Sequence, residues 1–92
     1  MSGQSSHRPR SDLYYRKLVD GGIIYDEVSG AVHHLNATAA WIWEAFLEGR
    51  SPTDIIGELA RAFDLDPGSV ETDVEQAQDE FAGSGLFEPQ GE

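Results

Sequence analysis

The chain has no cysteine, few basic residues and no long apolar run. Without cysteine it cannot form a disulfide bond, a thiolate zinc site or a cysteine nucleophile. No segment approaches the roughly 18 consecutive apolar residues that a membrane helix needs, so we expect no membrane partner. The first residues include arginine but no apolar stretch behind it, which argues against a secretory signal and favours a cytoplasmic location.

Basic residues are scarce and unevenly placed. Lysine and arginine total 6 against 17 aspartate and glutamate residues, and the net charge is −11. Residues 1–17 hold four basic residues and one acidic residue, a net charge of +3, and residues 18–92 hold two and 16, a net charge of −14. Proteins that bind nucleic acid neutralise phosphates with lysine and arginine, so this balance predicts no nucleic-acid partner. The short basic arm either remains solvated or folds against a partner.

The chain length of 92 residues predicts one small domain. We expect residues 1–12 to be a disordered tail, residues 13–88 to form the domain and residues 89–92 to be a second tail. A core of this size favours a groove, an edge strand or a flat patch over a deep catalytic cleft.

The first half of the domain has the pattern of a small antiparallel sheet. Strands are predicted over residues 14–19, 23–28 and 31–35, which are rich in β-branched and aromatic side chains. Residues 20–22 (Asp-Gly-Gly) and 29–30 (Ser-Gly) are predicted to be the two tight turns. The third strand should then lie at an edge of the sheet.

The second half is predicted to be helical. A first helix over residues 39–48, capped by Asn36 or Thr38, should be the most buried, and Ser51 and Asp66 precede two further helices. Apolar residues form one stripe on each of these later helices: Ile55, Ile56, Leu59, Ala60 and Phe63 on the second, and Val70, Val74, Ala77 and Phe81 on the third. After the glycines at 83 and 85, Leu86 and Phe87 are predicted to return to the sheet as a short extended segment. The fold class is therefore α+β, in the order of a winged helix-turn-helix.

A winged helix suggests DNA binding, but the third helix does not suit it. Residues 69–82 would form the recognition helix, and they contain no lysine or arginine. Their five carboxylates would repel phosphate at every approach: Glu71, Asp73, Glu75, Asp79 and Glu80. One alternative is thus an acidic winged-helix regulator without a DNA surface, and another is an adaptor module that binds a protein partner.

Signals for metal binding and catalysis are weak. His33 and His34 are adjacent in a predicted strand, so their side chains point to opposite faces and cannot hold one ion. No arrangement of nucleophile, base and orienting group stands out, and no glycine-rich phosphate loop is present. We therefore predict no catalytic residues, no metal site and no cofactor. An edge strand, in contrast, offers unpaired N–H and C=O groups to an added peptide strand.

The order of several short motifs resembles the PqqD family of small peptide chaperones. The series runs Leu35-Asn36, Ile42-Trp43-Glu44, Glu48-Gly49-Arg50, Asp73-Val74 and Gly85-Leu86-Phe87-Glu88. The chain is also similar to the stand-alone leader-binding proteins of lasso-peptide systems. This resemblance covers about residues 18–88 and implies a three-stranded sheet followed by three helices.

The resemblance implies a non-catalytic recognition element for ribosomally made, post-translationally modified peptides. Its partners would be the leader of a precursor peptide and a modifying enzyme, such as a radical-SAM enzyme, a cyclase or a leader protease. The leader would bind as an added strand between the third strand and the third helix. The implied contacts are Val32, His33, His34 and Leu35 on the strand and Asp73, Val74, Gln76, Ala77, Glu80 and Phe81 on the helix. Asn36 and Trp43 look structural, and Trp41 is either a core residue or, if exposed, an anchor for a partner.

Overall fold

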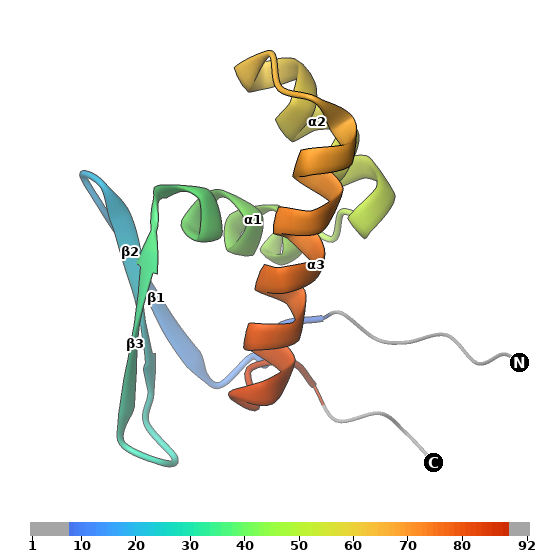
Figure 1. Cartoon of the computed structure of the whole chain (residues 1–92). Helices are drawn as coiled ribbons and strands as arrows, with labels where there is room; N and C mark the ends of the chain where they lie inside the picture. The colour runs from blue at the N-terminus through green and yellow to red at the C-terminus, as the bar shows by residue number, and fades with distance from the viewer. Residues whose placement is uncertain (1–7, 89–92) are drawn as a thin grey trace, which may run out of the picture.

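The computed structural model describes residues 8–88, which form a three-stranded antiparallel sheet followed by three helices (Figure 1). The strands are β1 (Leu13–Leu18), β2 (Gly21–Asp26) and β3 (Ala31–Asn36), and the helices are α1 (Ala37–Leu47), α2 (Pro52–Phe63) and α3 (Pro67–Gly83). The sheet order is β1-β2-β3, so β3 is an edge strand. The predicted α+β class and element order are confirmed, and residues 1–7 and 89–92 lie outside the described residues.

The first turn lies earlier than the sequence predicts. Val19 and Asp20 form the turn, and Gly21 and Gly22 are buried inside β2, with Gly21 opposite Leu18 of β1. A Cβ at position 21 would overlap a backbone carbonyl of β3, and a Cβ at position 22 would lie 2.6 Å from the ring of Tyr15. The two glycines are therefore needed for close packing and not for the turn.

Each helix begins with the side-chain cap that its sequence predicts. Asn36 accepts a hydrogen bond from the backbone N–H of Ala39 at 2.8 Å, which makes it, and not Thr38, the cap of α1. Ser51 and Asp66 cap α2 and α3 in the same way, each followed by proline at the first helical position. These caps satisfy N–H groups that a helix terminus otherwise leaves unpaired.

The core lies between the sheet and the helices, and α1 is its central element. Trp43 is 1% exposed and packs edge to face on Phe81 of α3, with 5.0 Å between the ring centroids. Phe46 and Phe87 complete the aromatic cluster. All four predicted stripe residues of α3 are buried, whereas Phe63, predicted on the stripe of α2, is largely exposed.

One face of the sheet packs on α1 and the other is open to solvent (Figure 1). Side chains of β2 alternate accordingly, with Ile24 and Asp26 buried and Tyr25 exposed. His33 is half-buried on the inner face of β3 and His34 is exposed on the outer face. The two histidines therefore point to opposite sides, as the sequence predicts.

The segment before β1 is held against the domain from residue 8 onward, which differs from the disorder expected of residues 1–12. The backbone of Arg10 donates to Leu86, and its guanidinium reaches Asp26 and the carbonyl of Gly85 at 2.9 Å. Phe87 forms its bridge with Pro9 and not with the three-stranded sheet, so that expectation is wrong. Arg10 of the basic arm therefore supplies a partner for the buried carboxylate of Asp26.

Candidate functional site

The open edge of β3 presents backbone groups whose direction follows from its register with β2. In an antiparallel pair, both backbone groups of one residue face the same neighbour, and successive residues alternate. A Cβ on Gly21 would overlap the carbonyl oxygen of Leu35, so that oxygen faces β2. Leu35 and His33 therefore bond to β2, and the N–H and C=O groups of Val32 and His34 point away from the sheet.

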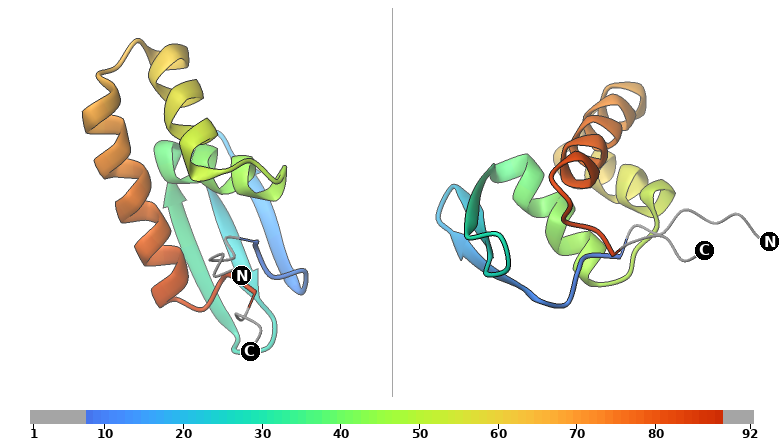
Figure 2. Two further views of the ribbon diagram at one scale, coloured as in Figure 1. Left: turned by 90° about the vertical axis from the view of Figure 1, so that its right-hand side faces the viewer. Right: turned by 90° about the horizontal axis from the view of Figure 1, so that it is seen from below.

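The opposite edge, β1, is less suited to an added strand. It carries Arg16 and Lys17 next to each other, both exposed. Charged residues on an edge strand hinder pairing with another chain. β3 carries no aspartate, glutamate, lysine or arginine, and it lies on the same side of the molecule as α3, with β1 at the far edge (Figure 2).

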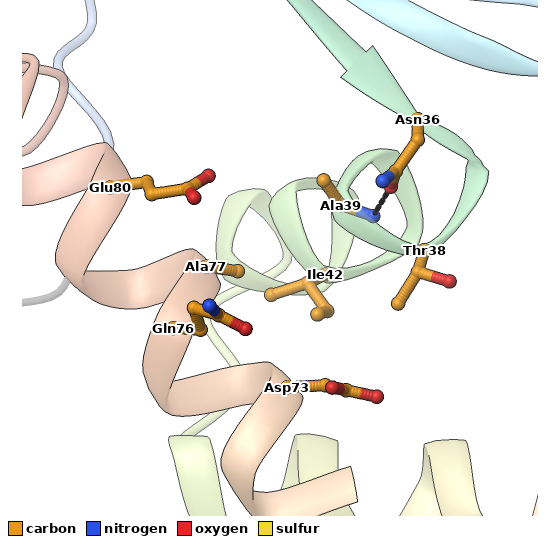
Figure 3. A pocket seen from close by; sticks show the side chains of 8 residues that line it. All are labelled: Asn36, Thr38, Ala39, Ile42, Asp73, Gln76, Ala77 and Glu80. Atoms are coloured by element: carbon orange, nitrogen blue, oxygen red, sulfur yellow. Dashed lines mark hydrogen bonds between the residues drawn. The ribbon is translucent and has the colours of Figure 1, made fainter.

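A cavity of about 260 Å³ lies where β3 ends, between α1 and α3 (Figure 3). α1 provides its floor with Ala39 and Ile42, and α3 provides one wall. Together with the open edge of β3 it forms a site that we call the β3–α3 groove. The residues that line the cavity are Asn36, Thr38, Ala39, Ile42, Asp73, Gln76, Ala77 and Glu80.

The structure brings together four of the six residues that the resemblance implies on α3. Asp73, Gln76, Ala77 and Glu80 all line the cavity. The other two, Val74 and Phe81, do not: they are 0% and 3% exposed and belong to the core. Of the apolar stripe residues Val74, Ala77 and Phe81, only Ala77 therefore lines the cavity, and Phe81 packs on Trp43 of α1.

The four residues implied on β3 are divided between the two faces of the sheet. Val32 and His34 are exposed on the outer face, and His33 and Leu35 are half-buried on the inner face. None of the four lines the cavity. An added strand would contact the backbone of Val32 and His34, and the side chains of His33 and Leu35 lie on the inner face of the same sheet edge.

Four lining residues were not among the sequence-based candidates: Asn36, Thr38, Ala39 and Ile42. The sequence predicts Asn36 and Thr38 only as capping residues, and the structure places both at the cavity because α1 follows the edge strand directly. Ile42 belongs to the broad apolar face of α1, where periodicity alone does not separate a groove floor from the core.

The α3 wall of the cavity is polar and acidic. The side chains of Asp73, Gln76 and Glu80 are exposed and point toward α1 (Figure 3). Within residues 8–88 these three side chains make no hydrogen bond or ion pair. Two unpaired carboxylates on one wall favour a ligand with positive charge.

Comparison with known proteins agrees with this architecture. The family model described as coenzyme PQQ synthesis protein D (PqqD) matches residues 21–86, which is most of the chain. The chain belongs to the PqqD family. It is a PqqD-like recognition element for ribosomally made, modified peptides. Proteins of this kind bind without catalysis, so the chain is a binding protein and not an enzyme.

Two solved structures share the fold of this PqqD-family chain. The first, described as TbiB1 in complex with the TbiA(beta) leader peptide, has a TM-score of 0.82 and 20% sequence identity, and the match covers 92% of this chain and 99% of that chain. The second, described as lasso peptide synthetase B1 complexed with the leader peptide, has a TM-score of 0.79 and 27% identity. This match covers 89% of this chain and 96% of that chain. No curated protein matches the sequence.

The described part of the chain has neither a metal-binding cluster nor a membrane-spanning helix. Residues 8–88 contain no group of three or more histidine, aspartate or glutamate side chains that could hold a metal ion. Across the same residues, no helix has the length and apolar character needed to cross a membrane.

Proposed function

We propose that this protein binds the leader segment of a ribosomally made precursor peptide and presents the peptide to a modifying enzyme. The observation that carries the proposal is the open edge of β3 beside the cavity formed with α1 and α3. Family membership and two similar structures that contain leader peptides support it. The precursor is made by ribosomes, so we place this step in the cytoplasm.

In the proposed complex, the leader adds one antiparallel strand to the sheet. Its backbone bonds to the outward groups of Val32 and His34, and backbone bonds of this kind supply affinity without sequence preference. The leader side chains that face inward reach the cavity floor at Ala39, Ile42 and Ala77, and their fit to this cavity supplies specificity. Residues 13–88 form the binding domain in this proposal, with residues 8–12 packed against it.

The acidic wall favours a basic leader and disfavours nucleic acid. The five carboxylates of α3 are exposed, and α3 has no lysine or arginine to neutralise phosphate. We therefore leave DNA and RNA out of the proposed function. Duplex binding that weakens with salt would contradict this and favour the alternative of a winged-helix regulator.

The partner enzyme is proposed to be a radical-SAM enzyme, a cyclase or a leader protease. A tagged copy of the protein, recovered from its native host at low salt, should retain a short ribosomal peptide together with a separate modifying enzyme. Intact-mass analysis of the retained material identifies both. A large protein retained without any peptide would instead favour the adaptor alternative.

Strand addition is tested by titrating the retained peptide, made synthetically, against two proline variants. Val32→Pro removes an outward N–H from the β3 edge, and we expect the affinity to fall at least about tenfold. Lys17→Pro is the matched control, because the alternation places its N–H on the outward side of the β1 edge. Equal losses in the two folded variants, or none in either, would overturn the geometry.

A further inference from the structure

A second cavity lies beside the β3–α3 groove, across the N-terminal turn of α1. Its volume is about 390 Å³, in the range of roughly 300–1,000 Å³ that ligand pockets commonly have. Trp41 of α1 and Leu59 of α2 line it, together with Phe63 and Leu65 at the end of α2. We call it the Phe63–Leu65 pocket.

The mouth of this pocket exposes apolar side chains that the fold leaves uncovered. Phe63 is 55% exposed and Leu65 is 49% exposed. Exposed side chains of this size are ordinary when scattered, but two that line one concave site mark a place for an apolar ligand group. Trp41, which is half-buried against the core, adds an aromatic wall.

The turn after α2 places Leu65 in the pocket at a cost in backbone energy. Asp64 has a φ of +53°, in the left-handed region that residues other than glycine disfavour. The next N–H, that of Leu65, donates to the carbonyl of Ala60 at 2.9 Å and so ends α2 in a tight reversal. The reversal returns Leu65 to the same cavity as Phe63.

The pocket and the groove are neighbours that share two residues. Thr38 and Asp73 line both cavities. β3 runs toward Asn36, so a strand that pairs with it in the antiparallel sense begins, at its own N-terminal end, close to Asn36. The peptide residues just before the paired segment therefore pass the boundary between the two cavities.

We propose that the Phe63–Leu65 pocket is a second subsite for the same peptide, and that it takes one large aliphatic or aromatic side chain. This side chain lies N-terminal to the segment that pairs with β3. Apart from Thr38 and Asp73 at the boundary, the lining residues are apolar, and burying a charged or unpaired polar group there is unfavourable. The inference rests on the proposed function, because it assigns the second site to the peptide of the first.

The test uses a random linear peptide library displayed on phage and selected on the full chain. The wild type should enrich peptides with an apolar residue at a constant spacing before a strand-forming segment. Selection on Leu65→Ser should lose the preference at that one position and keep the rest. Leu47→Ser is the matched control, because Leu47 is 50% exposed on α1 and lies outside both cavities.

An enriched peptide, made synthetically, then separates the two proposals. We expect it to bind Leu65→Ser and Phe63→Ser about tenfold more weakly than the wild type, and Leu47→Ser equally well. Unchanged binding to both pocket variants, with a loss in Val32→Pro, would overturn the second subsite and keep strand addition. A loss in the pocket variants alone would keep the pocket and overturn strand addition, and a library without any enrichment would overturn both.

Trp41 provides a second measurement, whose main comparison uses the wild type alone with two peptides. The enriched peptide should shift the tryptophan emission of the wild type to shorter wavelength, and the same peptide with serine at its apolar position should not. Trp41→Phe should abolish the shift, because the remaining tryptophan, Trp43, is already buried. An equal shift with both peptides would contradict occupation of the pocket.

Discussion

The phenol of Tyr15 on β1 donates a 2.6 Å hydrogen bond to Oε2 of Glu44 on α1. To reach α1, the ring crosses the strand between them at Gly22, where a Cβ would lie 2.6 Å from it. The bond ties the far edge strand to the central helix.

Loss of this bond should destabilise the domain without changing its fold. Tyr15→Phe removes the hydroxyl and keeps the ring, and we expect the free energy of unfolding at pH 7 to fall by about 1–2 kcal/mol. Chemical denaturation measures the change. A variant as stable as the wild type would show that the bond contributes nothing.

The same tyrosine should show an unusual alkaline titration. Burial, followed by the hydrogen bond to Glu44, raises the pKa of Tyr15 well above its ordinary value. Its neutral form is favoured in the folded state, so this contribution to stability is complete below about pH 10 and is lost as pH rises above that. An absorbance titration of the folded wild type should contain a late component that Tyr15→Phe lacks, and identical curves would contradict the prediction.

The pairing of Arg10 with Asp26 should make stability fall in acid. Hydrogen bonds from the Arg10 guanidinium, at 3.1 and 3.2 Å, hold the pKa of Asp26 below its usual range, although burial opposes them. Because the pKa of this carboxyl is lower in the folded state than in the unfolded state, its ionised form stabilises the folded state above about pH 4. This stabilisation is lost as the pH falls through the pKa of the folded state. Asp26→Asn should therefore be less stable than the wild type at pH 7.

The difference between Asp26→Asn and the wild type should shrink as pH is lowered, and urea denaturation across pH measures it. Asp20→Asn, in the exposed first turn, is the control for the loss of one carboxylate. A difference that is constant with pH would show that shape, and not charge, accounts for the effect of Asp26.

The glycines of β2 should tolerate no side chain. Gly21→Ala places a methyl group against the backbone carbonyl of Leu35, which cannot turn aside without moving β3. We expect a loss of about 1–3 kcal/mol in the free energy of unfolding, together with weaker peptide binding. Gly83→Ala is the control, because a Cβ there meets nothing within 4 Å, and it should be neutral or slightly stabilising. Equal stability of the two variants would contradict close packing at Gly21.

The acidic wall of the groove should act mainly on the rate of association. Asp73→Asn and Glu80→Gln should each slow association with a basic leader several-fold at low salt, and the wild-type rate should fall as salt rises. Glu71→Gln and Asp79→Asn, exposed on α3 but outside the cavity, are the controls. Stopped-flow mixing at several salt concentrations measures this, and a rate that is flat with salt would refute the electrostatic part.

Local signals in the sequence were enough to predict most of the elements. Caps such as Ser51 and Asp66, followed by proline, mark helix starts because the interactions lie within one turn of the chain. The apolar stripe of α3 predicts its buried face because helical periodicity alone determines which side chains share a face. The acidic composition of α3 likewise predicts, without any knowledge of the fold, that nucleic acid is not a partner.

Only the tertiary structure decided where the glycines of β2, the basic arm and the groove floor belong. An Asp-Gly-Gly sequence is typical of a turn, yet Gly21 and Gly22 are in the strand because Leu35 and Tyr15 lie against them. Arg10 pairs with a carboxylate 16 residues away, and no local pattern reveals that contact. Sequence by itself determined which residues are apolar, capping or charged. Packing between distant elements decided that Ile42 and Ala77 line the groove while Val74 and Phe81 are buried in the core. The reason is that the burial of a side chain depends on what lies opposite it.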